Sequence, residues 1–248
     1  MKKRRSAALL PWLILGLGIL GALLRALLYA TGVDNSGLLV DFHIYHILLG
    51  VLTVLTGACL VFLTRDLKQA GKYGFNFPKS VIGTVGSVAA AVGFGVSSVQ
   101  MLSSGGAGLA TACGILGLIS AVLLAVLAFA RLQGKQPSSV LSMAICVFLM
   151  VRLVYCYRLW SADPQLQDYI FALLANTGAM LACYFNAAFA TDEGNRRMHT
   201  LLHLAAVYCA VVCLPFSDDV IFYAAVAVWM FTDLCNLTPM PRTFEKVE

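Results

Sequence analysis

Long apolar runs alternate with short polar breaks along the whole 248-residue chain. A bilayer hydrocarbon core about 30 Å thick is crossed by a helix of about 20 predominantly apolar residues. Eight stretches qualify as candidate spans, and they cover residues 7–30, 42–63, 80–101, 107–130, 139–160, 165–190, 199–214 and 219–236. The pattern therefore predicts an all-α fold, a polytopic transmembrane helix bundle of about eight spans that forms one transmembrane domain over residues 1–248.

The distribution of lysine and arginine predicts the orientation of these spans. Of the 17 basic residues, all but Arg25, Arg152 and Arg158 lie in the N-terminal segment, the C-terminal segment or the loops on the same side. Cytoplasmic loops retain positive charge, so we expect both termini in the cytoplasm and the protein in the inner (plasma) membrane. Spans seven and eight are the shortest. Alternatively, they form a tight hairpin that does not fully cross, which also leaves the C-terminus inside.

Composition narrows the expected partners. Hydrophobic residues make up 60% of the chain and charged residues 12%, which excludes a soluble domain and makes the lipid bilayer the main partner. The net charge of +5 comes from basic residues spread thinly over short loops, so we expect no nucleic-acid binding. All eight cysteines fall in apolar stretches, where cysteine acts as a small packing residue. We expect no disulfide framework and no cofactor.

Small residues recur at helical spacing in several predicted spans. Glycine and alanine let helix backbones approach closely in lipid, so these positions predict packing faces. The faces comprise Gly18 and Ala22, then Gly50 and Gly57, then Gly83, Ser87, Ala91 and Gly95, then Gly106, Ala110 and Gly114. The predicted spans 80–101 and 107–130 should form a close antiparallel pair. The same faces could instead bind a membrane-protein partner, form a homo-oligomer or act as a sliding surface in a transporter.

Ionisable residues inside the predicted spans are the main candidates for function. A charge at a helix centre costs about 2.5 to 3.5 kcal/mol on insertion scales, so each needs a partner or a purpose. Arg25 and His46 continue small-residue faces, and Arg152 lies about 12 Å below the interfacial Trp160 with Tyr155 as a helical neighbour. The predicted outward-facing site comprises Arg25, His46, Arg152, Tyr155, Arg158, Asp41 and Asp168.

Two interpretations of this predicted site remain open. If its arginines outnumber its carboxylates, the natural ligand is a small anionic solute, because guanidinium binds carboxylate and phosphate in a bidentate manner. In the other interpretation, Arg25 pairs with Asp41 and Arg152 pairs with Asp168, and both pairs only hold the fold together.

The predicted span 219–236 carries Asp219, Tyr223, Met230 and Asp233 along one stripe. Such groups could line a proton or cation route, although they more often form hydrogen bonds between helices. We expect Asp233 to lie close enough to the cytoplasmic surface to be solvated.

His199 and His203 lie four residues apart on one face and are weak candidates for a metal site. Zinc needs at least three protein ligands, and the intervening residues lack the glutamate of the zinc protease motif. We therefore expect these histidines to form hydrogen bonds and not to bind the metal of a hydrolase. We also favour a protein that is not an enzyme.

Residues 158–164, 168–169, 180–184 and 194–197, which read RLWSADP, DY, MLACY and GNRR, resemble a group of uncharacterised bacterial multi-pass membrane proteins. The resemblance implies a membrane location and nothing about a substrate. We expect binding or transport of a small anionic solute as the function. A non-catalytic sensor or scaffold is the alternative, and an intramembrane hydrolase ranks third.

Overall fold

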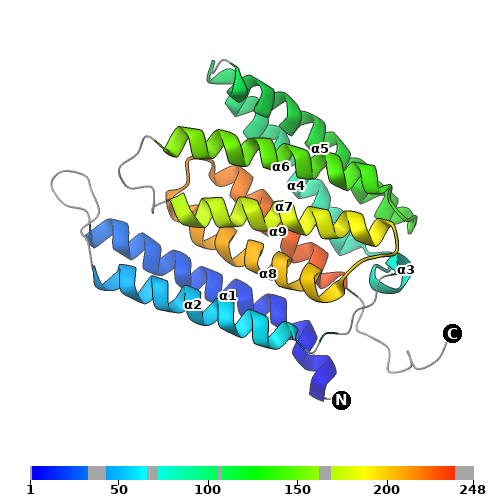
Figure 1. Cartoon of the computed structure of the whole chain (residues 1–248), viewed down its shortest axis with the longest axis horizontal. Helices are drawn as coiled ribbons and strands as arrows, with labels where there is room; N and C mark the ends of the chain where they lie inside the picture. Colours follow the sequence, from blue (N-terminus) through cyan, green and yellow to red (C-terminus); the bar gives the residue numbers. More distant parts are fainter. Residues whose placement is uncertain are drawn as a thin grey trace.

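A computed structural model describes residues 2–32, 43–65, 67, 72–105, 108–161 and 169–237. Over these residues the chain is all-helical (Figure 1), as the sequence predicts. The helices are α1 (Lys2–Thr31), α2 (Ile44–Thr64), α3 (Tyr73–Asn76), α4 (Val81–Ser103), α5 (Leu109–Gln133), α6 (Ser139–Trp160), α7 (Ile170–Ala190), α8 (Arg196–Cys213) and α9 (Val220–Cys235), with a 3-10 turn, η2 (Leu214–Phe216), before α9.

Helices α1, α2 and α4 to α8 are long and apolar enough to cross a membrane, and α9 is a shorter apolar helix. Large apolar side chains cover their outer faces, as Phe62 at 73% exposure and Val140 at 70% illustrate. Such an exterior is stable in lipid and costly in water. The chain is therefore a multi-pass integral membrane protein whose helix bundle fits about eight spans.

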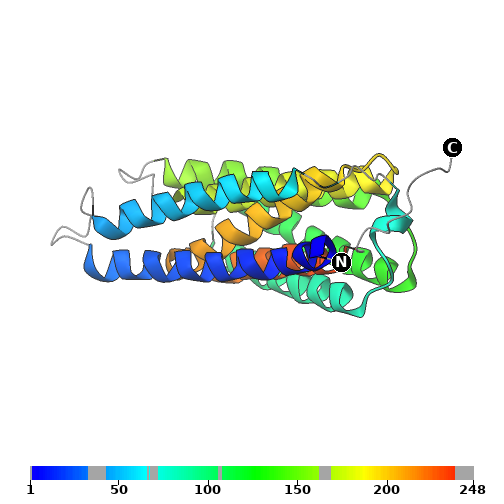
Figure 2. The ribbon, with the colours of Figure 1, turned by 90° about the horizontal axis from the view of Figure 1, so that it is seen from below.

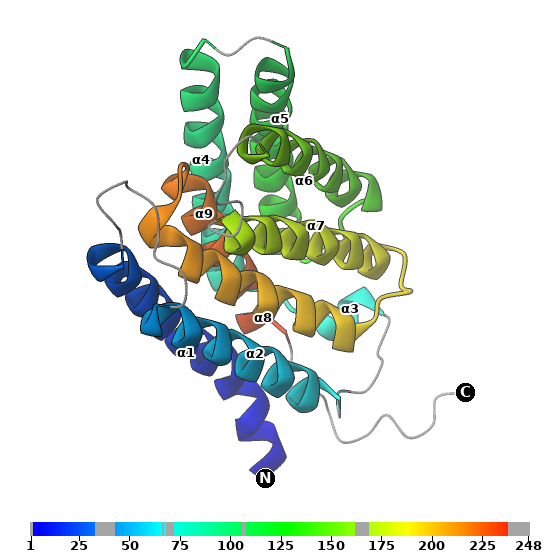
Figure 3. The ribbon, with the colours of Figure 1, turned by 60° about the vertical axis from the view of Figure 1, so that its left-hand side comes forward.

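The helices lie roughly parallel to the long axis of the molecule (Figures 1 and 2). Helices α1 and α2 form one side and α4, α5 and α6 the other, with α7, α8 and α9 between them (Figure 3). In its most apolar window, α8 has 67% of its residues buried, whereas α2 has only 22%. The core of the bundle therefore lies around α8 and α9, and α2 is peripheral.

Two aromatic contacts define the ends of the bundle. Near the start of α1, Trp12 packs edge-on against Phe231 of α9, and the ring centroids are 5.0 Å apart. At the other end of α1, Tyr29 stacks on Phe216 of η2 at 3.7 Å. The start of α1 and the end of α9 therefore lie at the same end of the bundle, which we call the basic end. We call the opposite end, where Tyr29 and Phe216 stack, the cleft end. Figure 2 places α3 at the basic end as well.

Side-chain caps fix where three helices begin. Ser80 caps α4 by accepting from the Gly83 amide, and Asn195 caps α8 by accepting from the Met198 amide. Asp219 caps α9, where its Oδ1 accepts from the Phe222 amide at 3.0 Å. Each cap satisfies a backbone donor that the first helical turn leaves free. Asp219 therefore has a structural task besides the ion pair described below.

The predicted packing faces are confirmed at the described residues of three helices and wrong on α2, and Gly106 lies outside the described residues. A Cβ added at Gly18 would lie 3.2 Å from Val211, and one added at Gly114 would lie 2.7 Å from Leu102, so neighbouring helices pack closely there. The predicted pair of spans appears as α4 packed along α5. On α2, in contrast, nothing lies within 4 Å of a Cβ at Gly50 or Gly57, because this face points away from the bundle.

Candidate functional site

The structure separates the residues that the sequence placed in one outward-facing site. Arg152 and Tyr155 lie together on α6 and line a cleft at the cleft end. Arg158, on the same helix, is exposed on its outer side. Asp41 and Asp168 lie outside the described residues, so their predicted pairing with Arg25 and Arg152 remains a prediction.

His46 and Arg25 are not among the residues that line the cleft. His46 is exposed on α2 and does not face the bundle, so its predicted inward position is wrong for the same reason as that of Gly50. Arg25 is buried as expected, with 3% exposure. Its guanidinium donates to the Val212 carbonyl at 3.4 Å and lies 5.6 Å from the Phe171 ring centroid, in the packing between α1, α8 and α7.

The cleft has a volume of about 230 Å³ and lies between the C-terminal halves of α4 and α6 and the start of α9. Its polar lining comes from all three helices. The residues with hydrogen-bonding or charged groups include Ser97, Gln100, Arg152, Trp160, Asp218 and Asp219. The volume is below the range of drug-sized pockets, and it suits a ligand of a few heavy atoms.

Arg152 and Asp219 form the central ion pair of the cleft. The Arg152 Nη2 donates to Asp219 Oδ2 at 2.7 Å, and Ser97 donates to the same oxygen. The guanidinium carbon of Arg152 lies 3.6 Å from the centroid of the Phe222 ring, close enough for a cation–π contact. Arg152 is 4% exposed, whereas the Asp219 side chain is 21% exposed, so solvent reaches the pair through its carboxylate.

A second carboxylate stands beside this pair. Asp218 is exposed and accepts from the Trp160 Nε1 at 3.0 Å. The Trp160 indole in turn stacks on Tyr169, with ring centroids 4.5 Å apart, which fixes its orientation. A carboxylate has about four acceptor positions, so this single contact leaves capacity for a ligand.

Two buried polar atoms along the cleft lack a protein hydrogen-bond partner in the described part of the chain. They are the Tyr223 hydroxyl and the Arg152 Nε. Tyr223 is only 2% exposed and lines the cleft. Since a buried polar group without a partner costs about 1 to 3 kcal/mol, such atoms in a cleft are candidates for ligand contacts.

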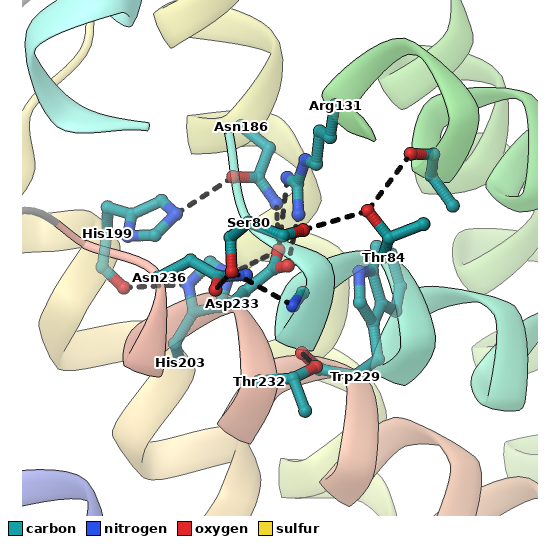
Figure 4. Close-up of polar contacts among 12 residues, drawn as sticks. Ser80, Thr84, Arg131, Asn186, His199, His203, Trp229, Thr232, Asp233 and Asn236 are labelled. Carbon is teal, nitrogen blue, oxygen red and sulfur yellow. Dashed lines mark hydrogen bonds and ion pairs between the residues drawn. The ribbon is translucent and has the colours of Figure 1, made fainter. Parts of the chain in front are cut away.

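The second polar site lies at the basic end, where α5, α7, α8 and α9 meet (Figure 4). Asp233 of α9 is fully buried, and the Arg131 guanidinium donates to both of its oxygens, the Nη2–Oδ2 distance being 3.2 Å. The Asn186 amide also donates to Oδ2, at 3.4 Å. The predicted solvation of Asp233 is wrong, because α3 and the ends of these helices close over it.

His199 and His203 are both fully buried within this basic-end site. Their rings stack with centroids 3.8 Å apart, and His203 Nε2 lies 3.7 Å from Asp233 Oδ2. Among the described residues, no three histidine, cysteine or acidic side chains are grouped closely enough to hold a metal ion. The hydrolase hypothesis needs such a third ligand, so the structure adds no support to it.

Tyr73 of α3 closes the basic-end site from outside the membrane-spanning helices. Burial raises the pKa of its phenol above the ordinary value, and the nearby Arg131 guanidinium lowers the pKa in part. Its backbone N–H donates to the Asp192 carboxylate at 2.8 Å. A neutral tyrosine thus lies over the Arg131–Asp233 pair at neutral pH.

The sequence missed Asp219 as the partner of Arg152. The available signal was topological, since span five ends and span eight begins on the same side of the membrane, which brings the two residues to one end of the bundle. Comparison of the chain with family models, with curated proteins and with solved structures gives no match. The resemblance to bacterial membrane proteins therefore stays a prediction, and what the chain does must be argued from its own two polar sites.

Proposed function

We propose that this integral membrane protein binds a small polar solute in the cleft and carries it across the membrane. The supporting observation is the Arg152–Asp219 pair, an ion pair within a membrane-spanning bundle that opens on a cleft of about 230 Å³. Ionisable groups at this depth are expensive and commonly belong to a solute or ion pathway. Among the described residues, the lysines and arginines of the loops and of the N-terminal segment lie on the side of the basic end. Because cytoplasmic loops retain positive charge, this supports a cytoplasmic location for that end, with the cleft facing outward.

The charges of the cleft indicate which solute to test. The expected anion requires more guanidinium groups than carboxylates. Among the described residues that line the cleft, Arg152 is the basic group and Asp218 and Asp219 are the acidic ones. Because Arg152 is already neutralised by Asp219, the remaining charge is that of Asp218. This balance favours a solute with an ammonium group, alone or in a zwitterion, over an anion.

The neighbouring aromatic rings also suit an ammonium group. Tyr155 and Trp160 line the cleft, and a ring face attracts a cation by about 0.5 to 2 kcal/mol. Trp160 turns its N–H edge to Asp218 and one face to Tyr169, so in this proposal the ammonium group binds the Asp218 carboxylate against the Tyr155 ring. A carboxylate on a zwitterionic solute would take the free Arg152 Nε and the Tyr223 hydroxyl.

The test is thermal unfolding of the purified protein in lipid nanodiscs with choline, glycine, acetate or inorganic phosphate. We expect choline or glycine to raise the unfolding midpoint by about 5 °C at saturation. Asp218→Asn should abolish this shift with little change in the unliganded midpoint, because Asp218 is exposed. Glu193→Gln is the matched control, since Glu193 is also exposed but follows α7 at the basic end.

Two outcomes would overturn the proposal. A larger shift with acetate or phosphate that is lost in Arg152→Gln would assign an anion to the cleft. If none of the four probes shifts the midpoint and none is taken up by proteoliposomes, the cleft does not bind a small charged solute.

A scaffold function remains the second candidate because of α2. This helix packs against α1 and α8 along one side, and its outer side carries apolar residues with Gly50 and Gly57 open to contact. Small residues on a lipid-facing helix favour close association with another helix. Gly50→Leu and Gly57→Leu should then abolish co-purification of a partner or a dimer without changing solute-dependent stability.

A further inference from the structure

The hydrogen bonds at the basic end determine which nitrogen of each histidine carries its proton. His203 Nδ1 lies 2.8 Å from the backbone carbonyl oxygen of His199. A carbonyl oxygen only accepts, so Nδ1 is the protonated nitrogen. A neutral imidazole has one N–H, and the His203 Nε2 therefore presents a lone pair.

His199 has the opposite tautomer. Its Nε2 lies 2.8 Å from the Asn186 side chain at Oδ1, which only accepts, so Nε2 carries the hydrogen. The Asn186 amide nitrogen, on the other side of the same group, donates to Asp233 Oδ2. The orientation of the Asn186 amide is thus consistent with both of its neighbours, and in the described part of the chain no hydrogen bond joins Asn186 to the His203 Nε2.

The acceptor positions of Asp233 are nearly filled. Arg131 supplies two donors and Asn186 supplies one, out of about four positions on a carboxylate. The remaining neighbour is the His203 Nε2, at 3.7 Å from Oδ2 and without a hydrogen-bond partner in the described part of the chain. With His203 neutral, a lone pair faces a carboxylate oxygen, which is an unfavourable contact between two acceptors.

We propose that His203 and Asp233 form a proton-binding site at the basic end of the bundle. The proton binds to the lone pair of His203 Nε2, which becomes an N–H donor to Asp233 Oδ2. No other bond breaks, because Nδ1 keeps its hydrogen and its bond to the His199 carbonyl. The step converts a repulsive contact into a charge-assisted hydrogen bond and adds one positive charge to the site.

The charges around His203 come from every helix that meets there. Beside His203 lie His199 of α8 and Asp233 of α9. The titratable and charged side chains that interact with these two are Tyr73 of α3, Arg131 of α5, Cys183 of α7 and Arg196 of α8. The two arginines oppose protonation and Asp233 favours it. Asp233 Oδ2 lies 3.7 Å from Nε2, close enough to attract the added proton, and Arg131 binds the same carboxylate from α5.

The site is distinct from the cleft, and α9 links the two. Asp233 lies at the end of α9 and Asp219 caps its start. A new donor takes the remaining acceptor position of Asp233, next to the two bonds from Arg131 that hold α9 to α5. The proton site therefore stands whether or not the cleft binds a solute.

The direct test is nitrogen NMR of the protein labelled with ¹⁵N in its histidine rings, reconstituted in lipid. The chain has only 4 histidines, and His203→Asn assigns the His203 signals by difference. At neutral pH we expect the less common Nδ1–H tautomer for His203 and the Nε2–H tautomer for His199. On acidification, His203 should become doubly protonated while His199 stays neutral.

Variants separate the proton site from a purely structural one. Asp233→Asn should suppress the protonation of His203, because an amide donor then satisfies Nε2. Asp218→Asn, at the opposite end, should leave the titration of His203 unchanged. If Asp233→Asn does not fold, the spectra of the wild-type protein still test the proposal. A His203 that carries its hydrogen on Nε2 at neutral pH, or that stays neutral down to the pH at which the protein unfolds, overturns the proposal.

Discussion

The two ion pairs of α9 differ in what surrounds them. Asp233 is completely buried, and its oxygens are held by Arg131 and Asn186. Asp219 is 21% exposed, and it divides its oxygens between Arg152, Ser97 and the start of its own helix. A buried carboxylate depends entirely on its protein partners, whereas an exposed one can exchange them for water or solute. The basic end therefore holds α9 in place, whereas the cleft end is accessible to water and solute.

The largest expected effect comes from Asp233→Leu. This change leaves the Arg131 guanidinium buried without its partner, which costs about 3 to 5 kcal/mol of stability and should lower the yield of folded protein. Thermal unfolding in nanodiscs measures the loss. The double variant Arg131→Met with Asp233→Leu should recover much of it, because two apolar side chains need no partner. A single variant as stable as the wild type would contradict the role of this pair in holding α9.

The next largest effect concerns the contact that positions α9 against α4. A Cβ at Gly86 would lie 2.1 Å from the Thr232 hydroxyl, so Gly86→Val must push the two helices apart. We expect a loss of about 1 to 3 kcal/mol, measured by thermal unfolding, as for other overpacked cores. Gly50→Val on the open face of α2 is the control and should change little. Equal effects of both variants would mean that α2 is also packed, for example against a second copy.

The smallest effect on stability is expected at the cleft end. Arg152→Gln leaves Asp219 with Ser97, its helix cap and solvent, so we expect a loss of about 1 to 2 kcal/mol, less than for Asp233→Leu. The same variant should weaken binding of a zwitterion such as glycine more than binding of choline. Arg158→Gln, on the exposed side of α6, serves as control. A loss of stability as large as that of Asp233→Leu would contradict the difference that we infer between the two ends of the bundle.

The sequence predicted the helices well because lipid imposes a simple rule on length and polarity. Residues 139–160 were predicted as a span and are α6. It also predicted that Arg152 and Arg25 are buried, since a charge so deep in a span must avoid lipid. The four-residue helix α3 was missed because it lies in a polar loop and is too short to show a hydrophobic pattern.

The neighbours of each helix could not be predicted in the same way. A small-residue face indicates close packing but not the partner, so Gly50 and His46 were placed inside the bundle when that face of α2 is exposed. The partners of Arg152 and Arg131 both lie on α9, far along the chain. Asp233 was expected to be solvated because it lies close to the end of its predicted span. That position does not reveal that other helices cover it.

The shortness of α9 has a consequence for the electric field across the protein. A helix of 16 residues rises about 24 Å, which is about 6 Å less than the hydrocarbon thickness of a typical bilayer. In a bilayer of that thickness, the hydrophilic groups at its two tips, Asp219 and Asn236, therefore cannot both reach the lipid headgroups. Solvent reaches Asp219 but not Asp233 or Asn236, so the cleft end alone shortens the distance over which the transmembrane voltage falls along α9. A charged group beside Asp219 therefore experiences a steeper field than one in the surrounding lipid.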